Sequence, residues 1–417
     1  MRVLSVKTTE RLRGVDALRG IAALGVVLYH AVGYRPHGQT GALWSWLAGP
    51  LWVGASFGYA GVFLFFVISG FCIHLQWARR RKTEDKPSID FRSFWKRRFR
   101  RLYPPYLIAL AIYLLVAGFT TKLQASAFYV WDITSHIFML HNLDSRTVYS
   151  INGVFWTLAV EEQLYLAYFP LLFLRNRFGW RPTLIICLAT RVIWLLFSVG
   201  ARNAWGFDIP VTEAAASHWF TWALGALAVE AALGIVILPK WCSRTSLGVM
   251  ALLSAVGLTY LLPVIESHEP LHSAGWLVLH PLWGSAFFFI LNRLVIAEQR
   301  WRELIKTPML VRTCASIGVF SYSLYLTHQL LLMESYRFTR LGLSETFVAV
   351  VILTPATIFF AWIFFAFCER PFLRPLSKAT PPDNLLVPVG ESYYFKVPLG
   401  KPSSLLNVNQ VEPRQSG

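Results

Sequence analysis

The sequence has few charged residues for its length. Asp, Glu, Lys and Arg make up only 15% of its 417 residues, whereas an ordinary soluble domain contains about 25%. Hydrophobic residues make up 55% of the chain, and the mean hydropathy is +0.48. This balance indicates a membrane protein whose chain crosses the bilayer several times.

Cysteine is also scarce, and the motifs of several enzyme classes are missing. The five cysteines are scattered, without a Cys-x-x-Cys or Cys/His pattern, so the sequence supports neither a disulfide framework nor a metal site. They are Cys72, Cys187, Cys242, Cys314 and Cys368. The sequence contains no P-loop, Rossmann fingerprint, His-Glu-x-x-His or Gly-x-Ser-x-Gly motif.

Ten apolar segments are long enough to cross a bilayer as helices. They cover residues 17–34, 57–77, 102–120, 153–174, 183–200, 214–237, 246–265, 274–294, 313–333 and 346–368. The first follows a basic N-terminus, but no convincing Ala-x-Ala site follows it, so we interpret it as an uncleaved span and not as a signal peptide. The sequence therefore predicts an all-α fold with about ten transmembrane helices.

The distribution of Lys and Arg predicts the orientation. With the N-terminus in the cytoplasm, the inner segments hold 30 of the 39 Lys and Arg residues and the outer loops hold six. Because cytoplasmic loops collect these residues, we expect both termini inside, and the net charge of +17 needs no nucleic-acid partner. We expect a cytoplasmic N-terminus over 1–13, a transmembrane domain over 14–372 and a flexible cytoplasmic tail over 373–417.

Arg19 and His30 are ionisable residues in the first span, where such residues mark function by default. They lie about 16 Å apart along a helix axis, yet within about 20° of the same face. This predicts a polar stripe that faces a cavity at two depths, without direct contact between the two side chains. The structural alternatives are snorkelling of Arg19 to the headgroups and an interhelical hydrogen bond of His30.

Glu161 and Glu162 are adjacent in the fourth span, and two carboxylates in hydrocarbon cannot both remain unpaired. Glu161 and His30 fall at compatible depths below the outer face, about 12 Å and 6–8 Å respectively. We therefore expect a pair in which Glu161 fixes the tautomer of His30. A structural charge network is the alternative.

Three other segments carry polar groups in or beside spans. "SYSLYLTH" (321–328) includes Tyr325 and His328, whose polar groups could simply join helices. Ser69 precedes a glycine in an apolar span, where small residues allow close helix approach or the passage of a thin ligand chain. "FWKRRFRRLYPPYLI" (94–108) places Arg97, Arg98 and Arg101 at the inner face. These arginines have two interpretations. One is the general excess of positive charge on the cytoplasmic side, and the more specific one is a binding site for a phosphate-bearing anion.

Six segments resemble, in order, the motifs of the acyltransferase-3 family, the bacterial membrane-bound O-acyltransferases of surface sugars and related acceptors. They are "VDALRGIAALGVVLYH", "GVFLFFVISGF", "RRFRRLYPPY", "FWTLAVEEQLYL", "SYSLYLTH" and "ERPF", and they run from about residue 14 to 372. The first holds an Arg and a His separated by ten residues, here Arg19 and His30. The fourth has Thr157 and Ala159 where the family often has serines.

The resemblance implies an acyltransferase domain of ten helices in the bacterial inner membrane. It implies a cytoplasmic acyl-CoA, usually acetyl-CoA, as co-substrate, with no bound cofactor, and a hydroxyl acceptor on a carbohydrate or glycolipid. It makes His30 the catalytic residue and Arg19 essential, and it makes Glu161, Arg98, Arg101 and His328 functional candidates. The extracytoplasmic hydrolase-like domain of some members is not expected after the tenth span.

We therefore expect Arg97, Arg98 and Arg101 to hold the phosphates of the donor, whose arm threads between helices toward His30. His30 would act as a general base or as a transient acyl carrier. Glu162, His328, Ser69 and Tyr325 are further candidates. The alternative function is a transporter or flippase without chemistry, in which the intramembrane charges would form an ion pathway.

Overall fold

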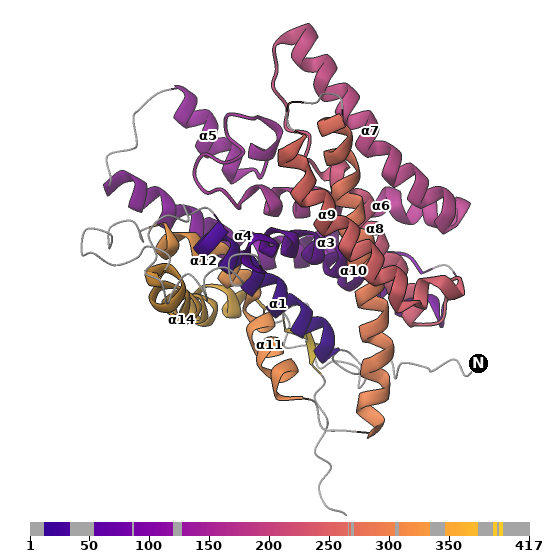
Figure 1. The fold of residues 1–417 in the computed structure, drawn as a ribbon. Helices are drawn as coiled ribbons and strands as arrows, with labels where there is room; N and C mark the ends of the chain where they lie inside the picture. The colour runs from indigo at the N-terminus through magenta and orange to yellow at the C-terminus, as the bar shows by residue number, and fades with distance from the viewer. Residues whose placement is uncertain are drawn as a thin grey trace, which may run out of the picture.

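The computed structural model describes residues 12–33, 54–85, 87–119, 127–265, 267, 271–304, 308–333, 347–373, 387–389 and 392–394. This part of the chain is almost entirely helical, as predicted (Figure 1). Its α-helices are α1 (Arg13–Leu28), α3 (Gly61–Arg81), α4 (Phe91–Phe119), α5 (Ala127–Ile137), α6 (Trp156–Phe178), α7 (Trp180–Trp205), α8 (Ala215–Ala232), α9 (Thr245–Val264), α10 (Leu271–Leu304), α11 (Met309–Val319), α12 (Ser321–Leu332) and α14 (Thr354–Phe364).

Shorter elements connect or extend these helices. The π-helical segments are η1 (Tyr29–Gly33), η6 (Val348–Leu353) and η7 (Phe365–Glu369). The 3-10 segments are η2 (Gly58–Ala60), η3 (His141–Leu143), η4 (Lys240–Ser243) and η8 (Arg370–Leu373). The strands β1 (Val387–Val389) and β2 (Ser392–Tyr394) form a two-stranded antiparallel sheet.

The described part of the chain contains seven helical stretches long and apolar enough to cross a membrane, or eight if the bent pair α11–α12 is one span. The seven are Arg13–Val32, Gly54–Arg81, Phe91–Val116, Trp180–Trp205, Thr245–Val264, Ala274–Glu298 and Val348–Leu373. Helices α6 and α8 cover the two other predicted segments. Both are less apolar, because α6 contains Glu161, Glu162 and Gln163 and α8 contains His218 and Glu230.

Glycine brings two helix pairs into backbone contact. Helix α3 packs along α8, and α1 packs along α11. A Cβ atom added at Gly70 of α3 would lie 2.0 Å from the carbonyl oxygen of Trp222, and one at Gly225 of α8 would lie 1.9 Å from a carbonyl oxygen of α3. Gly20 and Gly318 face each other in the same way between α1 and α11. Only glycine permits so close an approach.

Two elements depart from the expected boundaries. Helix α4 begins at Phe91 and continues through Pro104 and Pro105, so the arginines expected before the third span lie on the first turns of a 29-residue helix. The predicted span over 313–333 is broken at Phe320 into α11 and α12, which meet at 76°. The break turns the "SYSLYLTH" segment, now the start of α12, away from the axis of α11.

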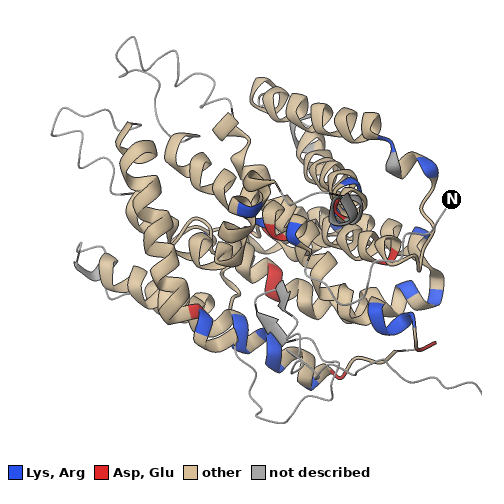
Figure 2. Ribbon diagram, turned by 90° about the horizontal axis from the view of Figure 1, so that it is seen from below, with Lys and Arg blue, Asp and Glu red and all other residues tan. Residues whose placement is uncertain are grey.

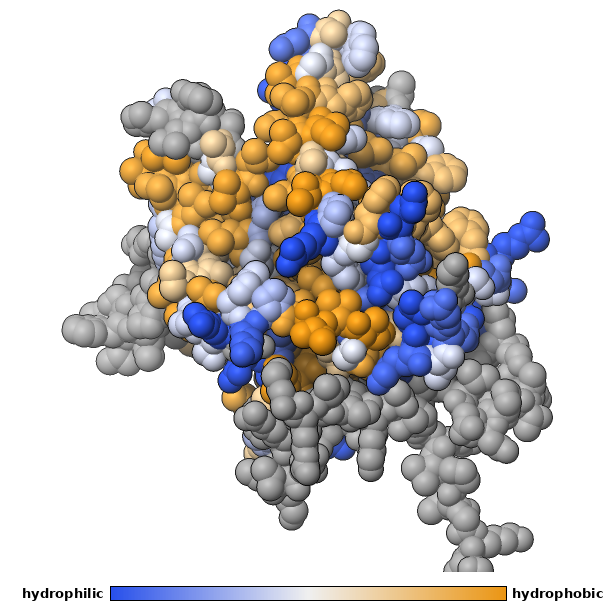
Figure 3. Space-filling view, turned by 90° about the vertical axis from the view of Figure 1, so that its right-hand side faces the viewer, coloured by the Kyte–Doolittle hydropathy of each residue, from blue (hydrophilic) through white to orange (hydrophobic). Residues whose placement is uncertain are grey.

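The surface combines apolar and basic regions. Exposed large apolar side chains of α7 and α9 include Ile185, Leu196, Leu253 and Val264. Figure 3 shows a broad apolar surface over the upper part of one face, with hydrophilic residues gathered toward its lower right. Figure 2, seen from below, shows more Lys and Arg than Asp and Glu. A broad apolar surface is what contact with lipid requires.

Candidate active site

A pocket lies among α1, α3, α4, α6 and α12. It brings together five residues that the sequence had singled out, with three further hydroxyl residues. These are Arg19, Ser69, Arg101, Glu161 and Tyr325, with Thr157, Ser321 and Tyr322. The remaining lining is apolar and comes from Val62, Phe65, Phe66, Leu102 and Leu158. The arrangement of a few polar groups in an apolar cleft is typical of a ligand site.

The carboxylate of Glu161 is held in the pocket by two hydroxyl groups. Its Oε1 accepts hydrogen bonds from Ser69 Oγ at 3.1 Å and from the Tyr165 hydroxyl at 2.5 Å. Ser69 Oγ in turn accepts a hydrogen bond from Trp222 Nε1 at 3.2 Å. Because Ser69 precedes Gly70, the close crossing of α3 and α8 is what brings this serine to both partners.

Tyr325 closes the pocket on the side of the histidines. Its hydroxyl bonds to Thr157 Oγ1 at 2.8 Å, and its ring centroid lies 5.8 Å from that of His328. Thr157 therefore supplies a hydroxyl where the family often has serine, and this hydroxyl is engaged in the site. The pocket thus extends from Arg19 and Arg101 to a tyrosine that contacts a buried histidine.

His30 and His328 lie side by side, with 4.9 Å between their ring centroids. His30 Nδ1 donates to the Val26 carbonyl oxygen at 2.8 Å, and His328 Nδ1 donates to that of Tyr325 at 2.9 Å. Carbonyl oxygens only accept, so each neutral ring carries its proton on Nδ1. His328 Nε2 lies 3.3 Å from His30 Nδ1 and can share its proton. His30 Nε2 is therefore the basic nitrogen of that ring.

The predicted pairing of His30 with Glu161 is replaced by these contacts. The structure places His328 against His30, and Ser69 and Tyr165 against Glu161. The Val26 carbonyl oxygen fixes the tautomer of His30, the role that we had expected of Glu161, and the fully buried His328 lies beside the same nitrogen. His30 itself lies in η1, a π-helical segment, and such segments are frequent at functional sites.

The predicted basic residues lie at different depths of the structure. Arg97 is exposed, whereas the half-buried guanidinium of Arg98 lies 5.6 Å from the Phe94 ring centroid and 5.9 Å from that of Tyr165. Arg101 lines the pocket directly. The arginines of α4 therefore form a path from the surface to the pocket.

Arg19 is buried, with 8% of its surface exposed, and lines the same pocket as Arg101. Both arginines act electrostatically on Glu369 of the "ERPF" segment. Glu369 also accepts a hydrogen bond from Ser323 of α12. The last predicted motif thus lies beside the cationic end of the pocket.

Glu162 differs from its neighbour Glu161. Its side chain is buried, and neither carboxylate oxygen has a hydrogen-bond partner among the residues that the structure describes. Tyr103 and Glu161 are the groups that interact with it electrostatically. The contacts give Glu161 a defined place in the pocket and give Glu162 none.

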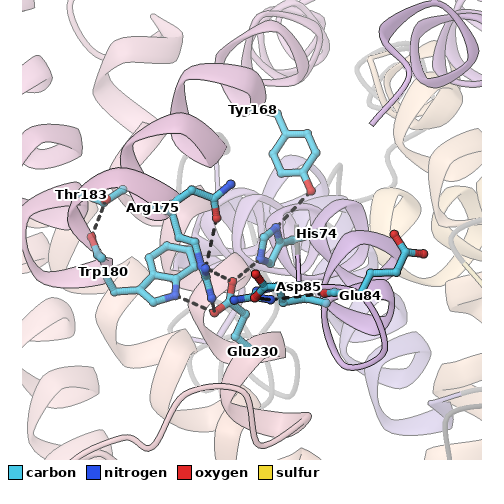
Figure 4. A network of polar contacts seen from close by, with 11 residues as sticks. His74, Glu84, Asp85, Tyr168, Arg175, Trp180, Thr183 and Glu230 are labelled. Carbon is cyan, nitrogen blue, oxygen red and sulfur yellow. Dashed lines mark hydrogen bonds and ion pairs between the residues drawn. The ribbon is translucent and has the colours of Figure 1, made fainter. Parts of the chain in front are cut away.

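A second polar network, which the sequence analysis missed, joins four helices (Figure 4). Glu230 receives hydrogen bonds from His74 Nε2 at 2.8 Å, from Arg175 at 2.8 and 2.6 Å, and from Trp180 Nε1 at 3.0 Å. The Tyr168 hydroxyl lies 3.1 Å from His74 Nδ1. Glu230 is a charge inside a predicted span, so the rule that marked Glu161 would also have marked it.

Trp77 connects this network to the chain before α4. Its ring stacks on His74 with 4.9 Å between centroids, and the Arg175 guanidinium lies 4.9 Å from its centroid. Its Nε1 donates to the Pro87 carbonyl oxygen at 2.9 Å. The network therefore fixes the start of the segment that leads to the arginines of α4.

Within the described ranges, no group of three or more His, Cys, Asp or Glu residues could hold a metal ion, and no disulfide joins the cysteines.

Comparison with known proteins gives one family. Residues 12–366 match the model of an acyltransferase domain. The chain is 27% identical over 407 residues to O-acetyltransferase OatA of Staphylococcus aureus strain NCTC 8325 / PS 47, with 91% of this chain and 60% of that protein covered. OatA of strains COL and MRSA252 matches with the same identity and coverage. The chain thus spans 60% of the length of these relatives. No solved structure matches it.

Proposed function

Because the chain belongs to the acyltransferase domain family, we propose that it is an integral membrane O-acyltransferase. The proposed donor is a cytoplasmic acyl-CoA, and the proposed acceptor is a hydroxyl group of a carbohydrate or a related molecule. The printed name of the relatives, O-acetyltransferase, favours acetyl as the acyl group.

The observation that carries the proposal is the pocket itself. It joins the cations of Arg19, which is buried, and Arg101, which is half-buried, to Tyr325, whose ring contacts His328 and, through it, His30. A thioester donor needs a cationic site for its phosphates, a narrow apolar passage for its arm and a base at the reacting carbonyl. The pocket and its two ends supply these three parts in that order.

The donor would bind by its phosphates at the arginines of α4. Arg97 is at the surface, Arg98 is half-buried, and Arg101 lines the pocket. Arginine holds phosphate by two parallel hydrogen bonds, which suits this role better than a point charge. The arm would then pass Ser69 and Glu161 on its way to the histidine pair.

His30 Nε2 would act on the acceptor in one of two ways. As a base, it takes the proton of the acceptor hydroxyl while that oxygen attacks the thioester carbonyl. The carbon–sulfur bond then breaks, and the proton passes to the CoA thiolate. As a carrier, it attacks the carbonyl itself, releases CoA and passes the acyl group to the hydroxyl, whose proton replaces the one given to CoA. In both routes, His328 supports the charge on His30 by accepting from its Nδ1.

We also propose a ten-span topology with both termini in the cytoplasm and a location in the bacterial inner membrane. Seven or eight helical stretches are apolar enough to cross, and α6 and α8, which carry buried polar networks, would complete the count. The concentration of Lys and Arg in alternate connections supports the orientation.

The test is release of free CoA from acetyl-CoA by the purified full-length protein in liposomes, with candidate carbohydrate acceptors. We expect CoA release that depends on acceptor, and a fall of at least about 100-fold in His30→Ala and His30→Gln. His280→Gln, the same change at another buried histidine outside the pocket, should retain turnover. Near wild-type turnover in the His30 variants would exclude its catalytic role, and movement of a substrate without CoA release would favour a transporter.

A further inference from the structure

Tyr165 contacts both functional parts of the proposed site. Its hydroxyl donates to Glu161 Oε1 at 2.5 Å, and the Arg98 guanidinium lies 5.9 Å from its ring centroid. The side chain is fully buried on α6, four residues after Glu161. This spacing places the two residues on one face of the helix.

The surroundings of Tyr165 hold its ring in place. Phe94 of α4 packs edge-on against the ring, with 6.3 Å between centroids and 86° between planes. Arg98 also lies 5.6 Å from the Phe94 centroid, so two aromatic rings hold the guanidinium. Because the ring is fixed by these contacts, its hydroxyl has a fixed position relative to Glu161.

The orientation of the Glu161 carboxylate depends on that hydroxyl. Ser69 and Tyr165 both donate to the same oxygen, Oε1. Two donors on one oxygen hold that oxygen in place. Loss of the Tyr165 hydroxyl would remove one of the groups that orient the carboxylate.

We propose that Tyr165 is a positioning residue that links the donor-phosphate site at Arg98 to the carboxylate of Glu161. A guanidinium against the ring polarises the phenol and strengthens its hydroxyl as a donor. The hydroxyl thereby keeps Glu161 oriented in the pocket while Arg98 holds the donor phosphates. This inference rests on the proposed function.

The ring and the hydroxyl can be separated by substitution. Tyr165→Phe keeps the ring against Arg98 and removes only the hydroxyl, whereas Tyr165→Leu removes both. In the CoA-release assay, we expect Tyr165→Phe to lower kcat about 10-fold, the effect of a lost hydrogen bond to a charged group, while the KM for acetyl-CoA changes less than about twofold. Tyr165→Leu should show the same loss of kcat and a KM for acetyl-CoA raised about fivefold.

Tyr168→Phe is the matched control. Tyr168 is a buried tyrosine of the same helix that packs on Phe94, but its hydroxyl meets His74 and not Glu161. It should leave both the kcat and the KM for acetyl-CoA close to wild type. Arg98→Lys keeps the charge but loses the planar contact with the rings, and should raise the KM for acetyl-CoA without the Tyr165→Phe loss of kcat.

The outcomes separate the inference from the function on which it rests. If the wild-type protein releases CoA and Tyr165→Phe has unchanged kcat, or raises KM as much as Tyr165→Leu, the positioning role of Tyr165 is wrong. If the wild-type protein releases no CoA with any acceptor, the proposed function fails first. Size-exclusion profiles and thermal unfolding in detergent check that each variant folds. If Tyr165→Leu does not fold, Tyr165→Phe and Arg98→Lys still decide the matter.

Discussion

Neighbouring residues of one helix can have opposite surroundings, as Glu161 and Glu162 do. Successive residues of an α-helix point about 100° apart, so two adjacent side chains can have different neighbours. Glu161 lines the pocket with two hydrogen-bond donors. Glu162 is buried without a hydrogen-bond partner in the described structure.

Replacing Glu161 or Glu162 by the isosteric glutamine should therefore have different effects on turnover. We expect Glu161→Gln to lower kcat in the CoA-release assay about 10-fold or more, because the amide removes the charge that accepts from Ser69 and Tyr165. Glu162→Gln should keep its turnover and unfold at the same or a higher temperature, because no partner loses a charge. A large loss of turnover in Glu162→Gln alone would contradict this assignment.

For single residues, the sequence predicts which side chains line the site better than it predicts which of them contact each other. Charge inside a span marked Arg19 and Glu161, the basic segment at the inner face marked Arg101, and all three line the pocket. The pairing of His30 with Glu161 was inferred from depth along two helices. Depth says nothing about how one helix is rotated toward another, and that rotation brings His328 to His30 instead.

Among the helices, α10 shows how a proline is compensated. Pro281 has no N–H group, so the Leu277 carbonyl oxygen, four residues earlier, lacks its intrahelical donor. Arg191 of α7 supplies one, donating from Nε to Leu277 O at 3.0 Å and from Nη2 to Trp276 O at 2.8 Å. It also donates to Ser217 O at 2.8 Å. This buried arginine therefore has a structural role between three helices.

Arg191→Met should lower the free energy of unfolding by about 3 kcal/mol, because three carbonyl oxygens lose a charged donor and Leu277 O is left without any. In that background, Pro281→Ala should recover about 1 kcal/mol, since residue 281 can then donate to Leu277 O within the helix. Thermal unfolding in detergent of the single and double variants measures the coupling. Strict additivity of the two changes would show that Arg191 does not compensate for the proline.

The boundaries of a helix can be predicted from the sequence where the length of an apolar segment determines them. Helix α9, for example, covers Thr245–Val264, and the predicted segment was 246–265. The start of α4 could not be predicted in this way. Its first turns are basic and two prolines follow them, a pattern that is typical of a loop. In the structure, packing of Phe94 against α6 supports a helix that begins at Phe91. The break at Phe320 has no glycine or proline within it and depends on tertiary contacts.

Across the whole molecule, the Glu230 network holds α3, α6, α7 and α8 to one another. Its central pairs are buried: Glu230 and His74 have side chains with no exposure, and Arg175 has 14%. Removal of one member of a buried ion pair is costly, because it leaves the other charge uncompensated. Exposed pairs such as Arg80–Glu84 contribute far less.

Glu230→Gln should therefore lower the free energy of unfolding by about 3 kcal/mol or more, with loss of activity only where the protein unfolds. Glu84→Gln, the same change in the exposed pair that Figure 4 also draws, should leave the unfolding temperature close to wild type. The measurement is thermal unfolding of both variants in the same detergent. Equal shifts in the two variants would argue against a structural role for the network.

The glycine contacts also decide which walls of the pocket can move. Where two backbones touch with no side chain between them, as at Gly70 and Gly225 or at Gly20 and Gly318, one helix cannot slide or roll without a backbone clash. The walls from α1 and α3 are therefore fixed to α11 and α8. Any widening of the pocket must therefore come from its other walls, on α4, α6 and α12.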